Sequence, residues 1–357
     1  MINIAKPIIG KEEINAVINV LNSGILAQGQ VVKEFEERFA DYIKTKYAIA
    51  TSSGTTALHT ALLAHDIGRN NEVITTPFSF VATSNSILAV GAKPVFVDIE
   101  KDTFNINPDL IQEKITKKTK AILPVSLYGH PCNMEEIMKI AEENNLIVIE
   151  DCSQSHGSEI NGKKSGSFAT SCFSFYPTKN ITTSEGGIIT TNDNKIAEKS
   201  RMIINHGSKV RYQHEILGYN FRMTNIAAAI GIEQLKKLDY FNKKRIENAD
   251  YLIKNLKDTN IILPKTKPGY KHVFHQFTII VENRDEILKK LYENEIKADV
   301  YYPLPIPEQP YYKKLKYSSN GLNIVNEVCK KVLSIPVHPS LTKEELDYII
   351  KVLKENT

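Results

Sequence analysis

Short apolar runs alternate with stretches of helical periodicity between residues 47 and 151. The runs are rich in β-branched residues and apolar throughout, which is typical of parallel strands covered on both faces; they span 47–51, 73–76, 94–98, 121–126 and 146–151. Apolar positions at helical spacing lie between and beside them, over 55–65, 82–91, 108–115 and 134–145. This order indicates βαβ units, so we predict an α/β fold with a mostly parallel sheet.

The pattern differs on either side of this region. Two amphipathic helices are predicted before it, at 13–22 and 31–43, with Gly24 as the stop of the first. A long helical stretch follows at 225–256, and after it a strand at 274–281 and helices at 284–295 and 343–356. We therefore expect a large domain over residues 1–240 and a smaller α+β domain over 241–357, with the long helix linking them.

Composition and charge exclude several classes of protein. Apolar residues make up 42% of the chain, charged residues 24%, and the formal net charge is +4. The basic runs are short, which disfavours a nucleic-acid partner, and no apolar run approaches the ~20 residues of a membrane helix. None of the four cysteines forms a CxxC pair, so we expect reduced thiols and no metal site in a cytoplasmic protein; they are Cys132, Cys152, Cys172 and Cys329.

A small turn opens directly into a helix after the first predicted strand, in the stretch "SSGTTAL". Free backbone N–H groups and a positive dipole make a helix start a natural anion site. Gly54 permits close approach, and Thr55 and Thr56 add hydroxyl groups. The simpler interpretation is an ordinary Ser/Thr cap.

Two further polar residues lie at the ends of predicted strands. Asp151 ends "LIVIED", where a carboxylate at the tip of a buried strand needs a partner. Lys179 lies two residues after "SCFSFYP", which is also predicted to be a strand, and precedes a glycine pair. Apolar walls would favour its neutral, nucleophilic amine. Taken alone, each has a simpler interpretation, a capping aspartate and a solvated surface lysine.

The order of these features changes their interpretation. An anion site, a strand-end carboxylate and, 28 residues later, a lysine in a glycine-containing turn suit pyridoxal 5′-phosphate (PLP). That cofactor requires a phosphate site, an acid opposite its ring nitrogen and a lysine for the Schiff base.

Longer motifs carry a family resemblance over nearly the whole chain. They include "SSGTTALHTALLA", "VITTPFSFVATSNSI", "IEDCSQSHGS", "FSFYPTKNITTSEGGIITTND", "LGYNFRMTNIAAAIGIEQL" and "YYPLPIPEQPYY". The chain resembles the DegT/DnrJ/EryC1/StrS family of PLP-dependent nucleotide-sugar aminotransferases. The resemblance implies the type I, aspartate aminotransferase-like fold, with a large PLP-binding domain and a smaller C-terminal domain.

The resemblance also implies roles for residues around the cofactor ring. Lys179 matches the Schiff-base lysine, and Asp151 matches the carboxylate that faces the ring nitrogen. Gln154 matches the glutamine beside the ring and its hydroxyl. Phe80 matches the aromatic residue stacked on the ring, although a lone phenylalanine is more often a core residue.

The phosphate ligands implied by the resemblance are Gly54, Thr55, Thr56 and Ser174. Asn220 matches an asparagine that reaches the phosphate of the neighbouring subunit, so the resemblance implies a homodimer with shared active sites. Two histidines have weaker assignments: we expect a structural, hydrogen-bonding role for His156, and His206 is a lesser candidate for facing the substrate.

The expected reaction is transfer of an amino group, from glutamate by family resemblance, to a 3-keto or 4-keto sugar linked to UDP or dTDP, in amino-sugar or surface-polysaccharide biosynthesis. Members that carry histidine at the lysine position are dehydratases, so Lys179 favours transamination. The stretch "NITTSEGG" departs from the glycine-rich run of many members, and its hydroxyls and Glu185 are expected to alter the substrate pocket.

Two other classes stay open. One is a PLP-binding regulatory protein without turnover, which the intact set of Lys179, Asp151 and Gln154 disfavours. The other is a type I lyase acting on amino acids, which would need an arginine for the α-carboxylate. Arg284 is the only arginine after Arg245, and it lies where a solvated helix is predicted to begin.

Overall fold

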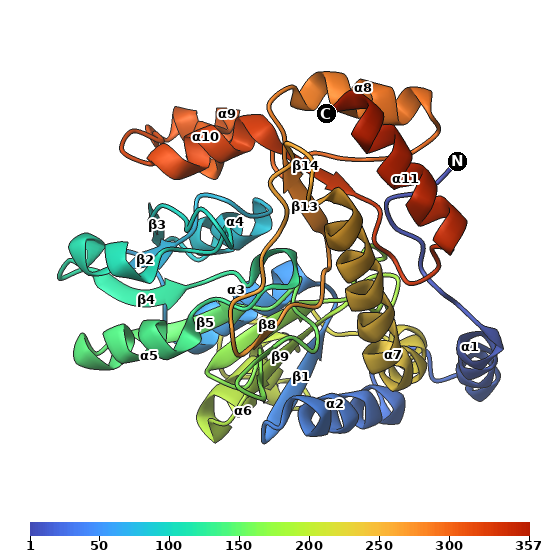
Figure 1. Cartoon of the computed structure of the whole chain (residues 1–357). Coiled ribbons are helices and arrows are strands. Elements are labelled where there is room, and N and C mark those ends of the chain that lie inside the picture. Colours follow the sequence, from blue (N-terminus) through green and yellow to red (C-terminus); the bar gives the residue numbers. More distant parts are fainter.

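A seven-stranded sheet forms the centre of the molecule (Figure 1). The computed structural model describes all residues from Met1 to Thr357. The strand order is β1-β9-β8-β5-β4-β2-β3. The strands are β1 (Tyr47–Thr51), β2 (Glu72–Thr75), β3 (Lys93–Phe96), β4 (Thr119–Leu123), β5 (Ile147–Asp151), β8 (Thr170–Ser174) and β9 (Gly187–Thr191).

Only β9 runs against the other strands of this sheet. It is antiparallel to both β1 and β8, so β1 and β8 share one direction, and β8, β5, β4, β2 and β3 are parallel in turn. The predicted α/β fold with a mostly parallel sheet is confirmed. Strand β9 was not among the predicted strands, and nothing in its short apolar run indicates that it runs against its neighbours.

Both faces of the sheet are covered by helices, and the strand residues alternate between two cores. Ala48 and Ala50 of β1 face a core with α2 and α7, while Ile49 between them faces a core with α3 and α6. Ile188 and Ile189 of β9 divide in the same way. This period of two explains why the strands are apolar at every position.

The helices around the sheet largely follow the predicted ranges. They are α2 (Gln30–Ile43), α3 (Gly54–Ala64), α4 (Ala82–Ala89), α5 (Met134–Glu143) and α6 (Asn194–Ile203). The exception is 108–115, predicted as one helix, where the chain forms two 3₁₀ turns, Pro108–Leu110 and Gln112–Lys114. Pro108 and Ile111 are buried there, and Leu110 and Ile115 pack partly buried against the same core as Ile111, but a stretch this short is marginal as a helix.

A smaller region packs above the sheet, towards the top of Figure 1, around its own apolar core. The elements around this core are β13 (Phe277–Ile280), paired antiparallel with β14 (Val332–Ile335), and the helices α8 (Arg284–Glu293) and α11 (Lys343–Asn356). Near the other end of the chain, Ile2 packs into the same core and pairs with Ile296. The helices α9 (Pro310–Lys314) and α10 (Asn323–Lys331) pack instead into a core that they share with Phe78 and Phe96 of the large region.

The long helix α7 (Asn225–Leu256) joins the two regions. Its residues Ala228 and Leu238 belong to a core of the large sheet, whereas Ala249 and Leu252 belong to the core of the smaller region. The division into residues 1–240 and 241–357 stays a prediction.

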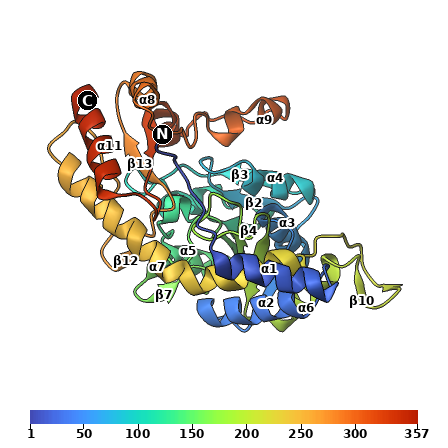
Figure 2. The same ribbon diagram turned by 90° about the vertical axis from the view of Figure 1, so that its right-hand side faces the viewer.

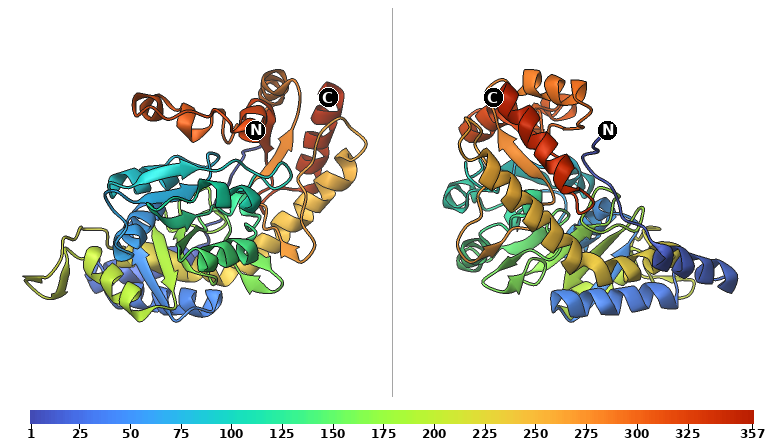
Figure 3. Two further views of the ribbon diagram at one scale, coloured as in Figure 1. Left: turned by 90° about the vertical axis from the view of Figure 1, so that its left-hand side faces the viewer. Right: turned by 45° about the vertical axis from the view of Figure 1, so that its right-hand side comes forward.

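The remaining elements lie at the periphery. Helix α1 (Lys11–Ser23) packs against α7 and ends at Gly24, whose φ of 70° is left-handed, as its predicted stop role requires. A small sheet joins β6 (Glu159–Ile160), β7 (Lys163–Lys164) and β12 (Tyr270–Lys271). The hairpin of β10 (Ser208–Val210) and β11 (Gln213–His214) projects from the body (Figures 2 and 3). None of the helices combines the length and apolar character needed to cross a membrane.

Candidate active site

The carboxyl ends of the parallel strands open into a cavity of about 530 Å³, here called the cofactor cavity. Parallel strands end at one edge of a sheet, so the residues that follow them meet there. Seven of the nine predicted site residues line it: Gly54, Thr55, Phe80, Asp151, Gln154, Ser174 and Lys179. Thr56 and Asn220 do not.

Asp151 is held in one orientation at the end of β5. Its side chain is buried, with 4% of the residue exposed. One carboxylate oxygen, Oδ2, accepts a hydrogen bond of 2.8 Å from Thr83 Oγ1, and Oδ1 accepts one of 3.0 Å from Ser153 N. Ser79 Oγ donates in turn to Thr83 Oγ1 at 3.3 Å. The carboxylate is therefore fixed from a helix and from its own loop, as a charge aimed at a ligand must be.

Thr83 was missed by sequence reasoning. It lies inside α4, where its apolar and small neighbours give no sign of a polar partner. The contact joins residues 68 positions apart, and only the fold brings them together.

Lys179 is partly buried in the loop after β8, and its N–H donates to Tyr176 O at 2.9 Å. Burial lowers the pKa of the Lys179 amine to about 8, against the opposing pull of the Asp151 charge. About a tenth of the amine is therefore neutral at pH 7, far more than for an exposed lysine. That form is the nucleophile for a carbonyl compound.

The start of α3 provides the anion site. Ser53 caps the helix, accepting from Thr56 N at 3.1 Å, and Thr56 Oγ1 accepts from Ser53 N at 2.9 Å. The N–H groups of Gly54 and Thr55 have no such partner, and both residues line the cavity. A Cβ atom added at Gly54 would lie 2.6 Å from Ser174 Cβ, so glycine lets the helix start approach β8.

Thr56 therefore has the capping role that was the simpler interpretation of the motif. Its predicted contact with a phosphate stays a prediction.

Gln154 joins the site to the C-terminal part of the chain. Its Oε1 accepts from Tyr128 N at 2.9 Å, and its Nε2 donates to Tyr302 OH at 3.3 Å. Phe80 lies at the rim with 59% of the residue exposed, so its ring is open to a ligand rather than in the core. Tyr302 was also missed, because it lies 148 positions from its partner Gln154.

Comparison with known proteins identifies the chain. The model of the DegT/DnrJ/EryC1/StrS aminotransferase family matches residues 7–354. The chain belongs to this family. The predicted family, enzyme class and PLP dependence are thereby confirmed.

Its relatives in the family carry different names. The chain is 42% identical to a "Pleiotropic regulatory protein" of Geobacillus stearothermophilus, covering 97% of this chain and 94% of that one. It is 38% identical to a GDP-perosamine synthase of Escherichia coli O157:H7, with the same coverage. A solved structure of the "Putative sugar aminotransferase Spr1654" of Streptococcus pneumoniae, in its PMP form, superposes with a TM-score of 0.95 at 28% identity, covering 99% of this chain and 96% of that one.

The residues of the cofactor cavity fit the cofactor of this family. A helix start with free N–H groups suits a phosphate. Glycine is required at position 54 of this helix start, because any side chain there would collide with Ser174. A fixed carboxylate suits a protonated ring nitrogen, and an amine of lowered pKa suits an aldehyde. Each group that PLP requires is therefore present in one cavity.

The loop after Lys179 explains the departure from the glycine-rich run of many family members. Thr182 Oγ1 donates to Phe175 O, and Thr183 Oγ1 donates to Glu185 O, each at 2.8 Å. These hydroxyls brace the loop and do not line the cavity. Glu185 does line it, so this carboxylate is the part of the departure that faces a ligand.

The remaining candidates lie outside the cofactor cavity. Asn220 and His206 are exposed near the projecting hairpin, and their predicted roles stay predictions. His156 is buried against Phe173 and Phe175, and neither of its ring nitrogens has a hydrogen-bond partner. The expected hydrogen-bonding role of His156 therefore stays a prediction; the ring packs between these aromatic residues, and burial lowers its pKa to about 3.

Arg284 was expected to lie in solvent at the start of a helix, but its side chain is largely buried. It begins α8 and bonds to Asp285 and to Cys329 O, away from the cavity.

Proposed function

We propose that the protein transfers an amino group to a keto carbon of a nucleotide-linked sugar, with PLP as cofactor. The observation that carries this proposal is the meeting of Lys179, Asp151 and Gln154 in one cavity of a chain that belongs to a family of aminotransferases. The sugar is a 3-keto or a 4-keto compound, and GDP joins UDP and dTDP as a candidate carrier, because one relative is a GDP-perosamine synthase.

Each residue has a defined task in this proposal. When bound, PLP draws electrons away from the carbon beside the substrate nitrogen. Lys179 Nζ, with a pKa of about 8, can take up and release a proton near neutral pH, as a general base and acid must. Asp151 holds its negative charge where the ring nitrogen needs it, and the N–H groups at Gly54 and Thr55 bind the phosphate.

The amino donor and the assembly also belong to this proposal. Glutamate is the donor by resemblance to the family. A homodimer is supported by the hairpin of β10 and β11 that projects from the body, because an arm of this kind can reach a neighbouring subunit (Figure 2). Asn220 lies at the base of this hairpin, where it pairs with Asn205, three residues before β10. The four cysteines are free and buried, which supports the reducing cytoplasm as the place of action.

A regulatory role is the second candidate, favoured by the name of the 42% identical relative. A protein that only binds the cofactor has no need of an amine with a lowered pKa beside a fixed carboxylate. The amino-acid lyase is disfavoured because no arginine lines the cofactor cavity to hold an α-carboxylate.

The test is a panel of 3-keto and 4-keto sugars on GDP, UDP and dTDP, incubated with the PLP-loaded protein and glutamate. Mass spectrometry would detect the amino sugar, and 2-oxoglutarate would be measured in parallel. We expect one carrier and one keto position to be preferred. Tight binding of a sugar nucleotide with no amino product from any member would support the regulatory role and contradict the proposal.

A further inference from the structure

The loop between β8 and β9, residues 175–186 and here called the lysine loop, carries Lys179 outside any helix or strand. Its internal hydrogen bonds are local. Lys179 N donates to Tyr176 O at 2.9 Å, and Thr183 N donates to the preceding part of the loop, at Phe175 O, at 3.0 Å. Such bonds fix the shape of a loop but not its place in the site, so the position of Lys179 depends on contacts with other elements.

The central sheet sets this position only in part. Strands β5 and β8 pair as far as Asp151 and Cys172, where their ladder ends. The chain after β5 continues to Gln154 and His156, and the chain after β8 continues into the lysine loop. Beyond the last pair, the segment with the acid and the segment with the amine need another connection.

Asn242 of α7 supplies such a connection. Its Nδ2 donates to His156 O at 2.8 Å, and its Oδ1 accepts from Asn180 Nδ2 at 2.7 Å. The two ends of this amide are thereby assigned, since only the nitrogen can donate to a carbonyl. Asn180 directly follows Lys179, and His156 lies in the segment that begins at Asp151. One side chain therefore joins the two segments beyond the end of the ladder.

This contact is buried and closely packed. Asn242 is 1% exposed and Asn180 is 4% exposed, so water does not compete for their hydrogen bonds. Gly157 has a φ of +78°, and a Cβ atom added there would lie 2.8 Å from Asn242 Nδ2. Glycine at this position therefore lets the segment after β5 approach α7.

Helix α7 is a rigid base for the Asn242 side chain. Leu238 and Phe241, in the turn before Asn242, are buried in a core that also contains Ile181 of the lysine loop. Farther along the helix, Ala249 belongs to the core of the smaller region. A helix packed into both cores cannot shift without disturbing them, so the amide is held in place.

We propose that Asn242 is a positioning residue for the reaction. It holds the lysine loop and the segment after β5 at a fixed separation, so that the Lys179 amine and the Asp151 carboxylate face the same ligand. The inference rests on the proposed function, since it takes Lys179 to be the reacting amine. Asn242 itself does not line the cofactor cavity and acts through Asn180 and His156.

The test compares two buried asparagines of the same helix. Asn242→Leu keeps the approximate size of the side chain and removes both hydrogen bonds, whereas Asn180→Ala removes the lysine-loop side of the contact alone. Asn248→Leu is the matched control, because Asn248 is also buried on α7 but donates to Val337 O and His338 O instead of to the lysine loop.

Three quantities are measured in each variant. Mass spectrometry follows hydrogen exchange of the lysine loop in the cofactor-free protein. Stopped-flow absorbance gives the rate at which PLP attaches to that protein. Single-turnover kinetics of the loaded protein uses glutamate with hydrogen or deuterium at its α-carbon, which isolates the proton transfer assigned to Lys179.

Asn242→Leu should change all three quantities. The lysine-loop amides should exchange about fivefold to tenfold faster, because the loop loses a buried hydrogen bond. PLP attachment and the reaction with glutamate should slow roughly tenfold to a hundredfold, since a displaced amine reacts from a poorer geometry. The isotope effect should increase, because proton transfer becomes the slow step, while the KM for glutamate should change much less.

The other variants separate positioning from stability. Asn180→Ala should change the same quantities in the same direction, and the double variant should be no slower than Asn242→Leu, because the two residues share one hydrogen bond. Asn248→Leu should lower the melting temperature about as much as Asn242→Leu, since it too loses buried hydrogen bonds, but it should match wild type in the three quantities.

The inference is overturned if Asn242→Leu and Asn180→Ala match Asn248→Leu in loop exchange and in both rates, while the wild-type protein still aminates a keto sugar nucleotide. If Asn242→Leu does not fold, Asn180→Ala decides alone. Attachment of PLP to the wild-type protein at a lysine other than Lys179 would instead show that the proposed role of Lys179 is wrong.

Discussion

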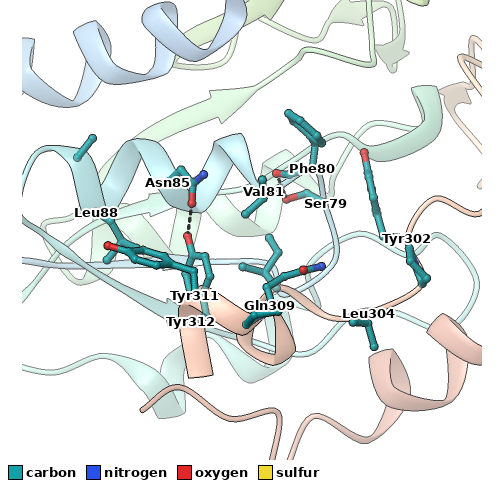
Figure 4. Close-up of a pocket in the computed structure, with 14 residues that line it drawn as sticks. Ser79, Phe80, Val81, Asn85, Leu88, Tyr302, Leu304, Gln309, Tyr311 and Tyr312 are labelled. Carbon is teal, nitrogen blue, oxygen red and sulfur yellow. Dashed lines mark hydrogen bonds between the residues drawn. The ribbon is translucent and has the colours of Figure 1, made fainter. Parts of the chain in front are cut away.

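The cofactor cavity contains polar and charged groups at strand ends and loop starts, whereas a second cavity beside it, of about 710 Å³, has an uncharged lining that is mostly aromatic and apolar (Figure 4). In the first, Asp151 is held by two hydrogen bonds, and burial lowers the pKa of Lys179 to about 8. The second lies between α4 and the segment from Tyr302 to Tyr312. Phe80 and Tyr302 line both cavities, so a large substrate can extend from the first into the second.

The difference separates chemistry from the holding of a substrate. Proton transfer and anion binding need charges in fixed places, and a rigid sheet edge supplies these places. Contact with the part of a substrate that does not react needs surface area, which aromatic and apolar side chains can supply. The two tasks can therefore be disrupted separately by mutation.

The largest effect is expected from Lys179→Ala. The variant loses both the covalent link to the cofactor and the proton carrier, so turnover should fall by more than about a thousandfold. Binding of nucleoside diphosphates should be unchanged, since the second cavity is intact. Steady-state kinetics measures the turnover, and calorimetry measures the binding. The control is Lys163→Ala, at an exposed lysine over the Phe168 ring. Near-normal turnover would remove Lys179 from the reaction.

Asp151→Asn should come next. The substitution keeps the shape and the contact with Thr83 but removes the charge, so turnover should fall on the order of a hundredfold to a thousandfold. The cofactor should still attach at Lys179, and its spectrum should change, because the ring nitrogen loses its acidic partner. Asp66→Asn, at an exposed aspartate paired with Lys199, is the control. An unaltered spectrum and rate would place the acid elsewhere.

Thr83→Val tests whether the carboxylate needs its helix contact. Loss of a hydrogen bond to a charged group costs about 1.5–3 kcal/mol, so turnover should drop roughly tenfold to a hundredfold. Thr83→Ser restores the donor and should recover most of the rate. A purely structural role would instead lower the melting temperature in both variants without this difference in rate.

The smallest effect concerns pH. The lowered pKa of Lys179 means that the amine is protonated below about pH 8 and neutral above it. The rate at which PLP attaches to the cofactor-free protein should therefore rise about tenfold between pH 7 and pH 9 and then level off. Stopped-flow absorbance gives this profile. A rate that still rises steeply at pH 10 would show an amine exposed to water.

The cofactor cavity was largely predictable from sequence because its residues follow recognisable local patterns. Asp151 ends an apolar strand, Gly54 and Thr55 open a helix, and Lys179 lies in a marked turn. Once the strands are parallel, their shared edge brings these residues together. The same local reasoning failed at 108–115, where the apolar residues pack against one core but the chain forms two 3₁₀ turns in place of a helix.

The rest of the site depends on contacts between distant parts of the chain. Thr83 meets Asp151 across 68 positions, and Tyr302 meets Gln154 across 148. Tyr312 meets Asn85 across 227 positions. No local pattern contains this information, because it arises from the packing of the C-terminal segment against α4.

The most direct measurement is the site of covalent attachment. The protein loaded with PLP would be reduced with borohydride, digested and mapped by tandem mass spectrometry. We predict a single phosphopyridoxyl group on Lys179, and none there after prior incubation with the amino donor, which should convert the cofactor to its unattached amino form. Modification of another lysine, or of several lysines to similar extents, would contradict the account.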